Sequence, residues 1–166
     1  MTATDHAREL LHVAALAADS KQAEELVALD VSEPLPLTDI FLLASGRNER
    51  NVIAIAGEIE DKMIEAGVKT IRREGKAEGR WVLLDFGELV VHVQHAEERS
   101  YYSLERLWRD CPTVPLPEDV IASNAAARER SNESYDEPAD EAFEDTDRSM
   151  PGLGSAVSSV PGATGA

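Results

Sequence analysis

Residues 81–108, WVLLDFGELVVHVQHAEERSYYSLERLW, decide how this chain folds. Two apolar runs, 81–86 and 89–93, lie on either side of Gly87, and this arrangement predicts a β-hairpin with a tight turn. Five of the eight aromatic residues of the chain fall in this stretch. This stretch therefore contributes to a hydrophobic core, a binding surface or a catalytic centre. The residues around it indicate which of these it forms.

The rest of the chain up to Pro112 predicts an α/β fold. From Ala96 onward, apolar residues return at helical spacing and predict one closing helix. Upstream, Asn48 suits the N-cap of a long helix, and Gly67 suits its C-terminal stop. The other elements expected before the hairpin are a helix near 10–17, strands at 25–31 and 39–45, and a charged edge strand at 69–74. The order α-β-β-α-β-β-β-α implies a mixed β-sheet packed with helices.

The composition of the chain changes after residue 116. Residues 1–116 carry 13 Lys and Arg against 21 Asp and Glu, and residues 117–166 carry 3 against 11, so each part has a formal charge of −8. The second part holds two aromatic residues, Tyr135 and Phe143. Such a segment cannot bury enough apolar surface to offset its chain entropy. The sequence thus predicts one folded domain at 1–116 and an acidic, disordered tail at 117–166.

Charge, hydropathy and cysteine content exclude several classes of protein. The formal net charge of −16 argues against binding to nucleic-acid phosphates and favours a basic protein partner. No apolar run approaches the roughly 20 residues of a membrane span, and the N-terminus lacks a signal-peptide pattern. Cys111, the single cysteine, fits a reducing compartment. We therefore expect a cytoplasmic protein with no membrane association and no direct sequence-specific nucleic acid binding.

Short motifs that suggest chemistry lack the partners which that chemistry needs. The Ser-Gly turn at 45–46, before a helix, suits a phosphate, but no P-loop or Gly-x-Gly-x-x-Gly pattern accompanies it. The Asp-Phe-Gly at 85–87 matches the kinase metal-binding tripeptide, but no Gly-rich loop or catalytic loop is present. His92 and His95 are three residues apart on a strand and point to opposite faces, so their spacing does not converge on a metal.

The carboxylates and the cysteine give no stronger catalytic signal. A two-metal transferase needs acids that converge on one face, often as Asp-x-Asp on a strand, but Gly87 stands two residues after Asp85. Cys111 has no evident base near it in the sequence and is a poor candidate nucleophile. We therefore expect no catalytic residue, no metal and no cofactor. A nucleotidyltransferase-like enzyme or nucleotide-binding protein is kept as the alternative.

The aromatic residues of 81–108 are the strongest candidates for a binding surface. Trp81 follows a polar loop at the entrance of its strand, where a surface position is expected. Tyr101 and Tyr102 are adjacent on a helix, about 100° apart, so they cannot both lie at the centre of one buried stripe. Trp and Tyr dominate the hot spots of protein interfaces. The alternative, that all of these are core or boundary residues, stays open at this point.

Two long segments of the chain resemble a known family. They are DIFLLASGRNERNVIAIAGEIEDKMIEAG (39–67) and EGKAEGRWVLLDFGELVVHVQHAEERSYYSLERLW (74–108), and they are similar to the ribosomal silencing factor S family, also called Iojap-like proteins. The resemblance runs from about residue 5 to 116 and is most specific in WVLLDFGELVVHV and ERSYYSLERLW. The family usually has Thr-Ser after the Ser-Gly turn, whereas this chain has Arg47-Asn48. The residues at the helix cap therefore differ from the family pattern, but a cap is still present.

This resemblance implies a non-enzymatic translation repressor with an α/β fold related to nucleotidyltransferases. Members bind the large ribosomal subunit through a basic ribosomal protein on its intersubunit face. They block joining of the small subunit, chiefly under nutrient limitation. The interface residues of the family correspond here to Trp81, Asp85, Tyr101, Tyr102 and Leu104. Whether the protein is a monomer or a homodimer is left open.

Overall fold

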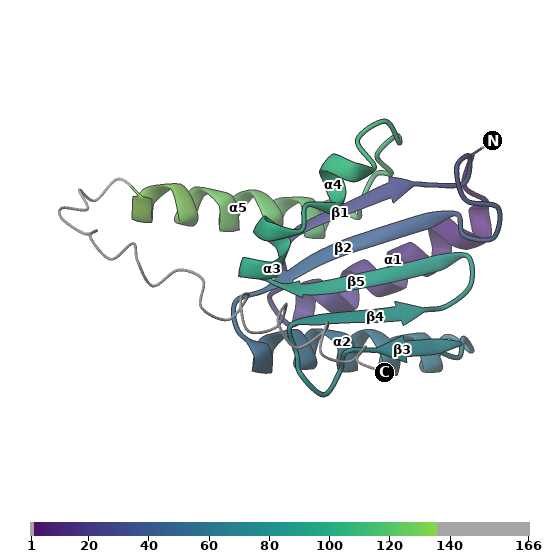
Figure 1. Ribbon diagram of the computed structural model, residues 1–166, viewed down its shortest axis with the longest axis horizontal. Coiled ribbons are helices and arrows are strands. Elements are labelled where there is room, and N and C mark those ends of the chain that lie inside the picture. Colours follow the sequence, from purple (N-terminus) through teal and green to yellow (C-terminus); the bar gives the residue numbers. More distant parts are fainter. Residues whose placement is uncertain (1, 136–166) are drawn as a thin grey trace, which may run out of the picture. The chain divides into compact units, whose positions relative to one another are not determined.

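The computed structural model describes residues 2–135, and Figure 1 shows how they are arranged. The elements in chain order are α1 (Asp5–Ser20), β1 (Glu24–Asp30), β2 (Ile40–Gly46), α2 (Glu49–Glu65), β3 (Arg72–Glu74), β4 (Trp81–Asp85), β5 (Leu89–His95), α3 (Ala96–Tyr101), α4 (Leu104–Leu107) and α5 (Glu118–Tyr135). Met1–Ser131 form one compact unit, and the second unit, Asn132–Ala166, contributes only the end of α5 to the described residues. Within residues 2–135, no helix is both long enough and apolar enough to cross a membrane.

The five strands form one mixed sheet in the order β1-β2-β5-β4-β3 (Figure 1). Strands β2 and β5 run parallel, and the other neighbouring pairs run antiparallel. In the β4–β5 hairpin, Trp81 pairs with Gln94 and Leu83 pairs with His92. The inner strands are β2, β5 and β4, and the short charged β3 lies at an edge. The structure confirms the predicted mixed sheet, with the 39–45 strand and the hairpin at its middle.

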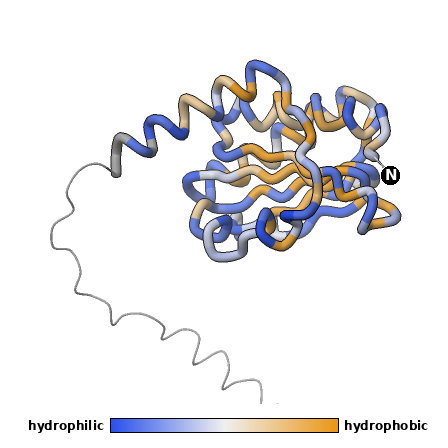
Figure 2. The backbone as a smooth tube through the Cα atoms, turned by 90° about the horizontal axis from the view of Figure 1, so that it is seen from above, coloured by the Kyte–Doolittle hydropathy of each residue, from blue (hydrophilic) through white to orange (hydrophobic). Residues whose placement is uncertain are grey.

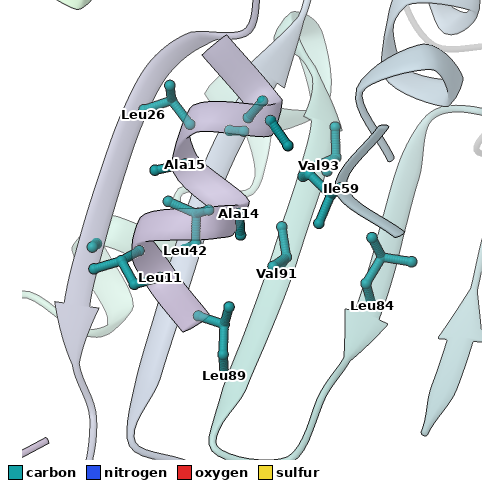
Figure 3. Packing of buried hydrophobic residues seen from close by; sticks show 14 of the residues in the cluster. Leu11, Ala14, Ala15, Leu26, Leu42, Ile59, Leu84, Leu89, Val91 and Val93 are labelled. Carbon is teal, nitrogen blue, oxygen red and sulfur yellow. The ribbon is translucent and has the colours of Figure 1, made fainter. Parts of the chain in front are cut away.

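Helices α1 and α2 cover one face of the sheet and lie behind the strands in Figure 1. Hydrophobic residues are concentrated along the strands (Figure 2). Val82 and Leu84 of β4 belong to the core beneath the helices. Because alternate strand residues point to opposite faces, Trp81, Leu83 and Asp85 point away from these helices. Figure 3 shows the packing through Leu11, Ala14, Ala15, Leu26, Leu42, Ile59, Leu89, Val91 and Val93.

A second, smaller apolar cluster lies on the opposite face of the sheet, over β1 and β2. Leu104 of α4 and Trp108, its C-cap, pack there against buried Leu29 and Leu43. The outward-pointing residues of β4 are only half-buried. This face of the sheet is therefore covered at β1 and β2 and open toward β4.

Three local sequence signals act as predicted. Asn48 caps α2, because its side chain accepts a hydrogen bond of 2.7 Å from the Asn51 N–H. Gly67 follows the end of α2 with φ +85°, a conformation that favours glycine. Gly87 has φ +93° and forms the turn of the β4–β5 hairpin.

The single closing helix expected from Ala96 is wrong, because the chain forms two short helices instead. Between α3 and α4, Tyr102 and Ser103 leave the helical conformation, with ψ angles of 85° and 95°. The break lets Leu104 and Trp108 pack on the sheet. Burial of these two apolar side chains favours the break over one uninterrupted helix.

Helix α5 lies in the segment that was expected to be a disordered tail. Val120 is fully buried, and the amide group of Asn124 exchanges hydrogen bonds of 3.0 and 2.9 Å with the backbone of Leu26. The burial of Val120 and the hydrogen bonds to β1 stabilise a helix that has little apolar periodicity of its own. The expectation of disorder is therefore wrong for residues 118–135, which form α5. The rest of that prediction, residues 136–166, lies outside the described residues, and the boundary at 116 stays a prediction.

Candidate binding surface on the open sheet face

The five predicted interface residues come from β4 and from the corner between α3 and α4. Trp81 and Asp85 begin and end β4, and both are half-buried. Tyr101 ends α3 and is 75% exposed, and Tyr102 is its C-cap and is 48% exposed. Leu104 begins α4 and is half-buried in the second apolar cluster. The structure brings Trp81 against Tyr102, which in turn contacts Tyr101, and it leaves Asp85 at the other end of the strand.

A continuous line of rings runs from the covered part of this sheet face to its open part. We call it the aromatic row, and its members in spatial order are Trp108, Phe41, His92, Trp81, Tyr102 and Tyr101. In that order, neighbouring ring centroids are 5.5, 5.0, 6.1, 5.5 and 4.8 Å apart. These separations, with tilted or edge-on planes, are favourable for aromatic pairs. The row begins in the second apolar cluster and ends at an exposed tyrosine.

The Trp81 ring is oriented by a hydrogen bond beneath it. Its Nε1–H donates to Nδ1 of His92 at 3.2 Å. This geometry requires a neutral His92 with its proton on Nε2. Burial lowers the pKa of His92 to about 4, so the ring is neutral near pH 7. His92 therefore acts as a buried support for Trp81.

His95 has a separate role at the start of α3. Its Nδ1 accepts a hydrogen bond of 3.1 Å from the Glu97 N–H and so caps the helix. His92 and His95 therefore have different partners, as the alternation along a strand predicts. In the part of the chain that the structure describes, no group of three or more His, Cys, Asp and Glu residues could hold a metal.

Asp85 supports the hairpin turn. Its Oδ1 accepts a hydrogen bond of 2.8 Å from the Gly87 N–H, which is an Asx-type turn. The Asp-Phe-Gly sequence is thus explained by the turn between β4 and β5. The interface role carried to Asp85 by the family resemblance stays a prediction.

Arg80 joins the first turns of α2 and α3. It donates to Glu97 at 3.0 Å, to Glu98 at 2.9 Å and to Glu49 at 3.2 Å. The hydrogen bonds to Glu97 and Glu98 raise the pKa of Arg80 above its usual range. Glu49 lies in the first turn of α2, so this ion pair places a carboxylate at the helix N-terminus that follows the 45–46 turn.

Two residues of this surface, Phe41 and His92, were not predicted from the sequence to share it with Trp81. The register of a hairpin about Gly87 nevertheless puts His92 diagonal to Trp81 on one face of the sheet. Leu107, which continues the apolar helical spacing after Ala96, is 70% exposed in the structure. The break before α4 changes which side of the segment meets the sheet, and no local signal predicted that break.

The fold and the aromatic row together define the class of protein. It is an α/β protein with two helices on one face of a mixed sheet and an aromatic surface on the other face. The chain belongs to the family described as ribosomal silencing factor during starvation, which matches residues 4–144. The family resemblance inferred from the sequence is thereby confirmed. The match continues past residue 116 through α5, and its last part, 136–144, lies outside the described residues. The family consists of ribosome-binding regulatory factors and is not known for enzymes.

Individual relatives agree with this assignment. The chain is 47% identical over 115 residues to ribosomal silencing factor RsfS of Halalkalibacterium halodurans, covering 69% of this chain and 97% of the relative. A crystal structure of a Chromobacterium violaceum protein superimposes with a TM-score of 0.60 at 36% identity, covering 61% of this chain and 84% of the other. A more distant mouse relative, named mitochondrial assembly of ribosomal large subunit protein 1, is 28% identical over 109 residues, covering 64% of this chain and 46% of the relative.

Proposed function

We propose that this protein binds the large ribosomal subunit through a basic ribosomal protein on its intersubunit face. The bound protein sterically blocks joining of the small subunit, chiefly under nutrient limitation. Membership in a family of ribosomal silencing factors supports this function. The name of the mouse relative also links related proteins with the large subunit.

The observation that carries the proposal is the exposed end of the aromatic row. Tyr101 and Tyr102 are exposed beside the half-buried Trp81, which is oriented by His92. Rings that are held in place lose little conformational freedom on binding. Aromatic anchors of this kind account for much of the binding energy in protein interfaces.

The charge of the protein supports a basic protein partner. The formal net charge of −16 attracts a positively charged protein and repels ribosomal RNA. Attraction of this kind speeds the encounter and weakens as salt screens the charges. The alternative, a nucleotidyltransferase-like enzyme, needs a second carboxylate that converges with Asp85. The Asp85 carboxylate instead accepts a hydrogen bond from the Gly87 N–H of its own turn.

The proposal is tested by binding of pure protein to isolated ribosomal subunits. Wild-type protein should sediment with large subunits and not with small subunits, and it should lower the yield of joined particles when both subunits are mixed. Trp81→Ala and Tyr101→Ala should each weaken binding by about 1–2 kcal/mol, as typical hot-spot substitutions do. Ile64→Ala is the matched control, because Ile64 is an exposed apolar residue (61%) on α2.

The pattern across these variants decides the outcome. Normal binding by Ile64→Ala together with weak binding by the two row variants supports the aromatic row as the contact. Circular dichroism of each variant separates lost contact from lost folding. Equal recovery of wild-type protein on small and large subunits would exclude the proposed mechanism.

A further inference from the structure

Arg99 of α3 is a buried charged residue whose guanidinium is hydrogen-bonded to three other elements of the fold. It is only 4% exposed. Its Nη1 donates to the Ser45 Oγ at 2.9 Å, and its Nη2 donates to the Glu25 carbonyl oxygen at 2.7 Å. Its Nε and Nη2 also donate to the two carboxylate oxygens of Glu105, both at 2.9 Å. One guanidinium thus joins β1, β2, α3 and α4.

The backbone of β1 is shaped to meet this guanidinium. Glu25 has φ +50°, which is unusual for a residue other than glycine. It lies where the register of β1 against β2 shifts between Glu24 and Val27, as in a β-bulge. The carbonyl group that accepts from Arg99 belongs to this residue. The strained conformation therefore coincides with one of the four contacts of Arg99.

The ion pair between Arg99 and Glu105 connects α3 with α4 at the corner where the exposed tyrosines lie. Arg99 lies on α3 and Glu105 on α4, and Tyr101 and Tyr102 lie between them in the chain. Helices of six and four residues are too short to be stable alone. Their placement has to come from contacts with the sheet and with each other. The hydrogen bonds of Arg99 also lower the pKa of Glu105, which keeps the pair charged near pH 7.

We infer that Arg99 is a positioning residue for the aromatic row, because it fixes α3 and α4 on the sheet and so holds Tyr101 and Tyr102 beside Trp81. This inference rests on the proposed function only where it concerns ribosome binding. The planar fork of arginine is required, since it donates in three directions at once. A lysine keeps the charge but cannot make the two-pronged contact with Glu105 and still reach Ser45 and Glu25.

The test compares Arg99→Lys with wild-type protein by hydrogen exchange and by binding to large subunits. The Tyr102 N–H donates to the Glu98 carbonyl and the Trp108 N–H to the Leu104 carbonyl, so these amides report on α3 and on α4. In Arg99→Lys both should exchange at least about tenfold faster, because a lost charged hydrogen bond is worth a factor of that size. Exchange at Val91, in the central strand β5, should stay within about twofold of wild type, because local opening does not unfold the core.

Two further variants accompany this comparison. Glu105→Gln removes the ion pair and leaves the contacts of Arg99 with Ser45 and Glu25, so it should loosen the same two amides to a smaller degree. It also provides the test if Arg99→Lys does not fold. Arg72→Lys is the matched control, because it makes the same exchange at an exposed ion pair on β3. It should change neither exchange nor binding.

The inference is supported if Arg99→Lys loosens Tyr102 and Trp108, spares Val91 and weakens subunit binding by about tenfold or more. Unchanged protection of Tyr102 and Trp108 would overturn it. Equal acceleration of Val91 would also overturn it, since Arg99 would then only stabilise the whole fold. If wild-type protein fails to bind large subunits, the proposed function is wrong, and the exchange data alone decide whether Arg99 positions the row.

Discussion

Replacing His92 by Asn should make the stability of this fold less sensitive to acid. His92 is 7% exposed, and burial lowers its pKa from 6.5 to about 4. Between these two values, the unfolded chain binds a proton at His92 that the folded protein does not bind. The contribution of the neutral ring to stability is therefore complete above pH 6.5 and is lost as the pH falls through this window.

The size of the effect follows from the two pKa values. Their difference corresponds to about 3 kcal/mol at full protonation of the unfolded chain. About 2 kcal/mol of this is lost between pH 7 and pH 5. An Asn side chain does not titrate, and its carbonyl oxygen can accept the Trp81 Nε1–H in place of the His92 Nδ1. The free energy of unfolding of His92→Asn should thus fall about 2 kcal/mol less than that of wild type over this range.

Urea unfolding at several pH values, followed by far-UV circular dichroism, measures this difference directly. The other titrating groups are common to both proteins and cancel in the comparison. His6→Asn is the control with the opposite sign, because a hydrogen bond to Glu88 raises the pKa of His6. That pair contributes stability at low pH and loses it as the pH rises through the raised pKa. Parallel pH curves for wild type and His92→Asn would refute the role assigned to His92.

Three further predictions follow from buried contacts. Burial of Glu60 opposes ionisation, but hydrogen bonds from Lys76 and Arg73 together lower the pKa of Glu60. Glu60→Gln should therefore lower the free energy of unfolding by about 1–3 kcal/mol at pH 7, measured by urea unfolding. This difference should shrink as the pH falls below 4.5, because the Glu60 carboxyl of the wild-type protein then takes up a proton, first in the unfolded chain and at lower pH in the folded protein. Gly75→Ala should cost at least about 1–3 kcal/mol, because Gly75 has φ +79° and an added Cβ would overlap the Trp81 carbonyl oxygen; a thermal midpoint equal to wild type would contradict this. Truncation after residue 116 removes the buried Val120 and should lower stability by at least about 2 kcal/mol, whereas truncation after 135 keeps that contact; equal midpoints for the two truncated proteins would show that α5 does not stabilise the unit.

Most of the α/β framework could be predicted because its signals are local. Gly87 marks the hairpin, Asn48 caps α2, and continuous apolar runs mark the central strands. The candidate site was predicted less completely. Trp81 and Tyr102 were expected at one surface and do lie together, but His92 and Phe41 join the row only through the pairing of three strands.

The sequence by itself determined the order of elements through β5, the faces of the strands and the resemblance to the silencing factors, because these depend on the period of apolar residues and on short motifs. The tertiary structure decided the break between α3 and α4 and the formation of α5. Both depend on partners far away in the chain. Arg99 reaches Ser45, and Asn124 reaches Leu26, across 54 and 98 positions of sequence. No local propensity encodes such contacts, because they stabilise a conformation only after the sheet has brought the partners together.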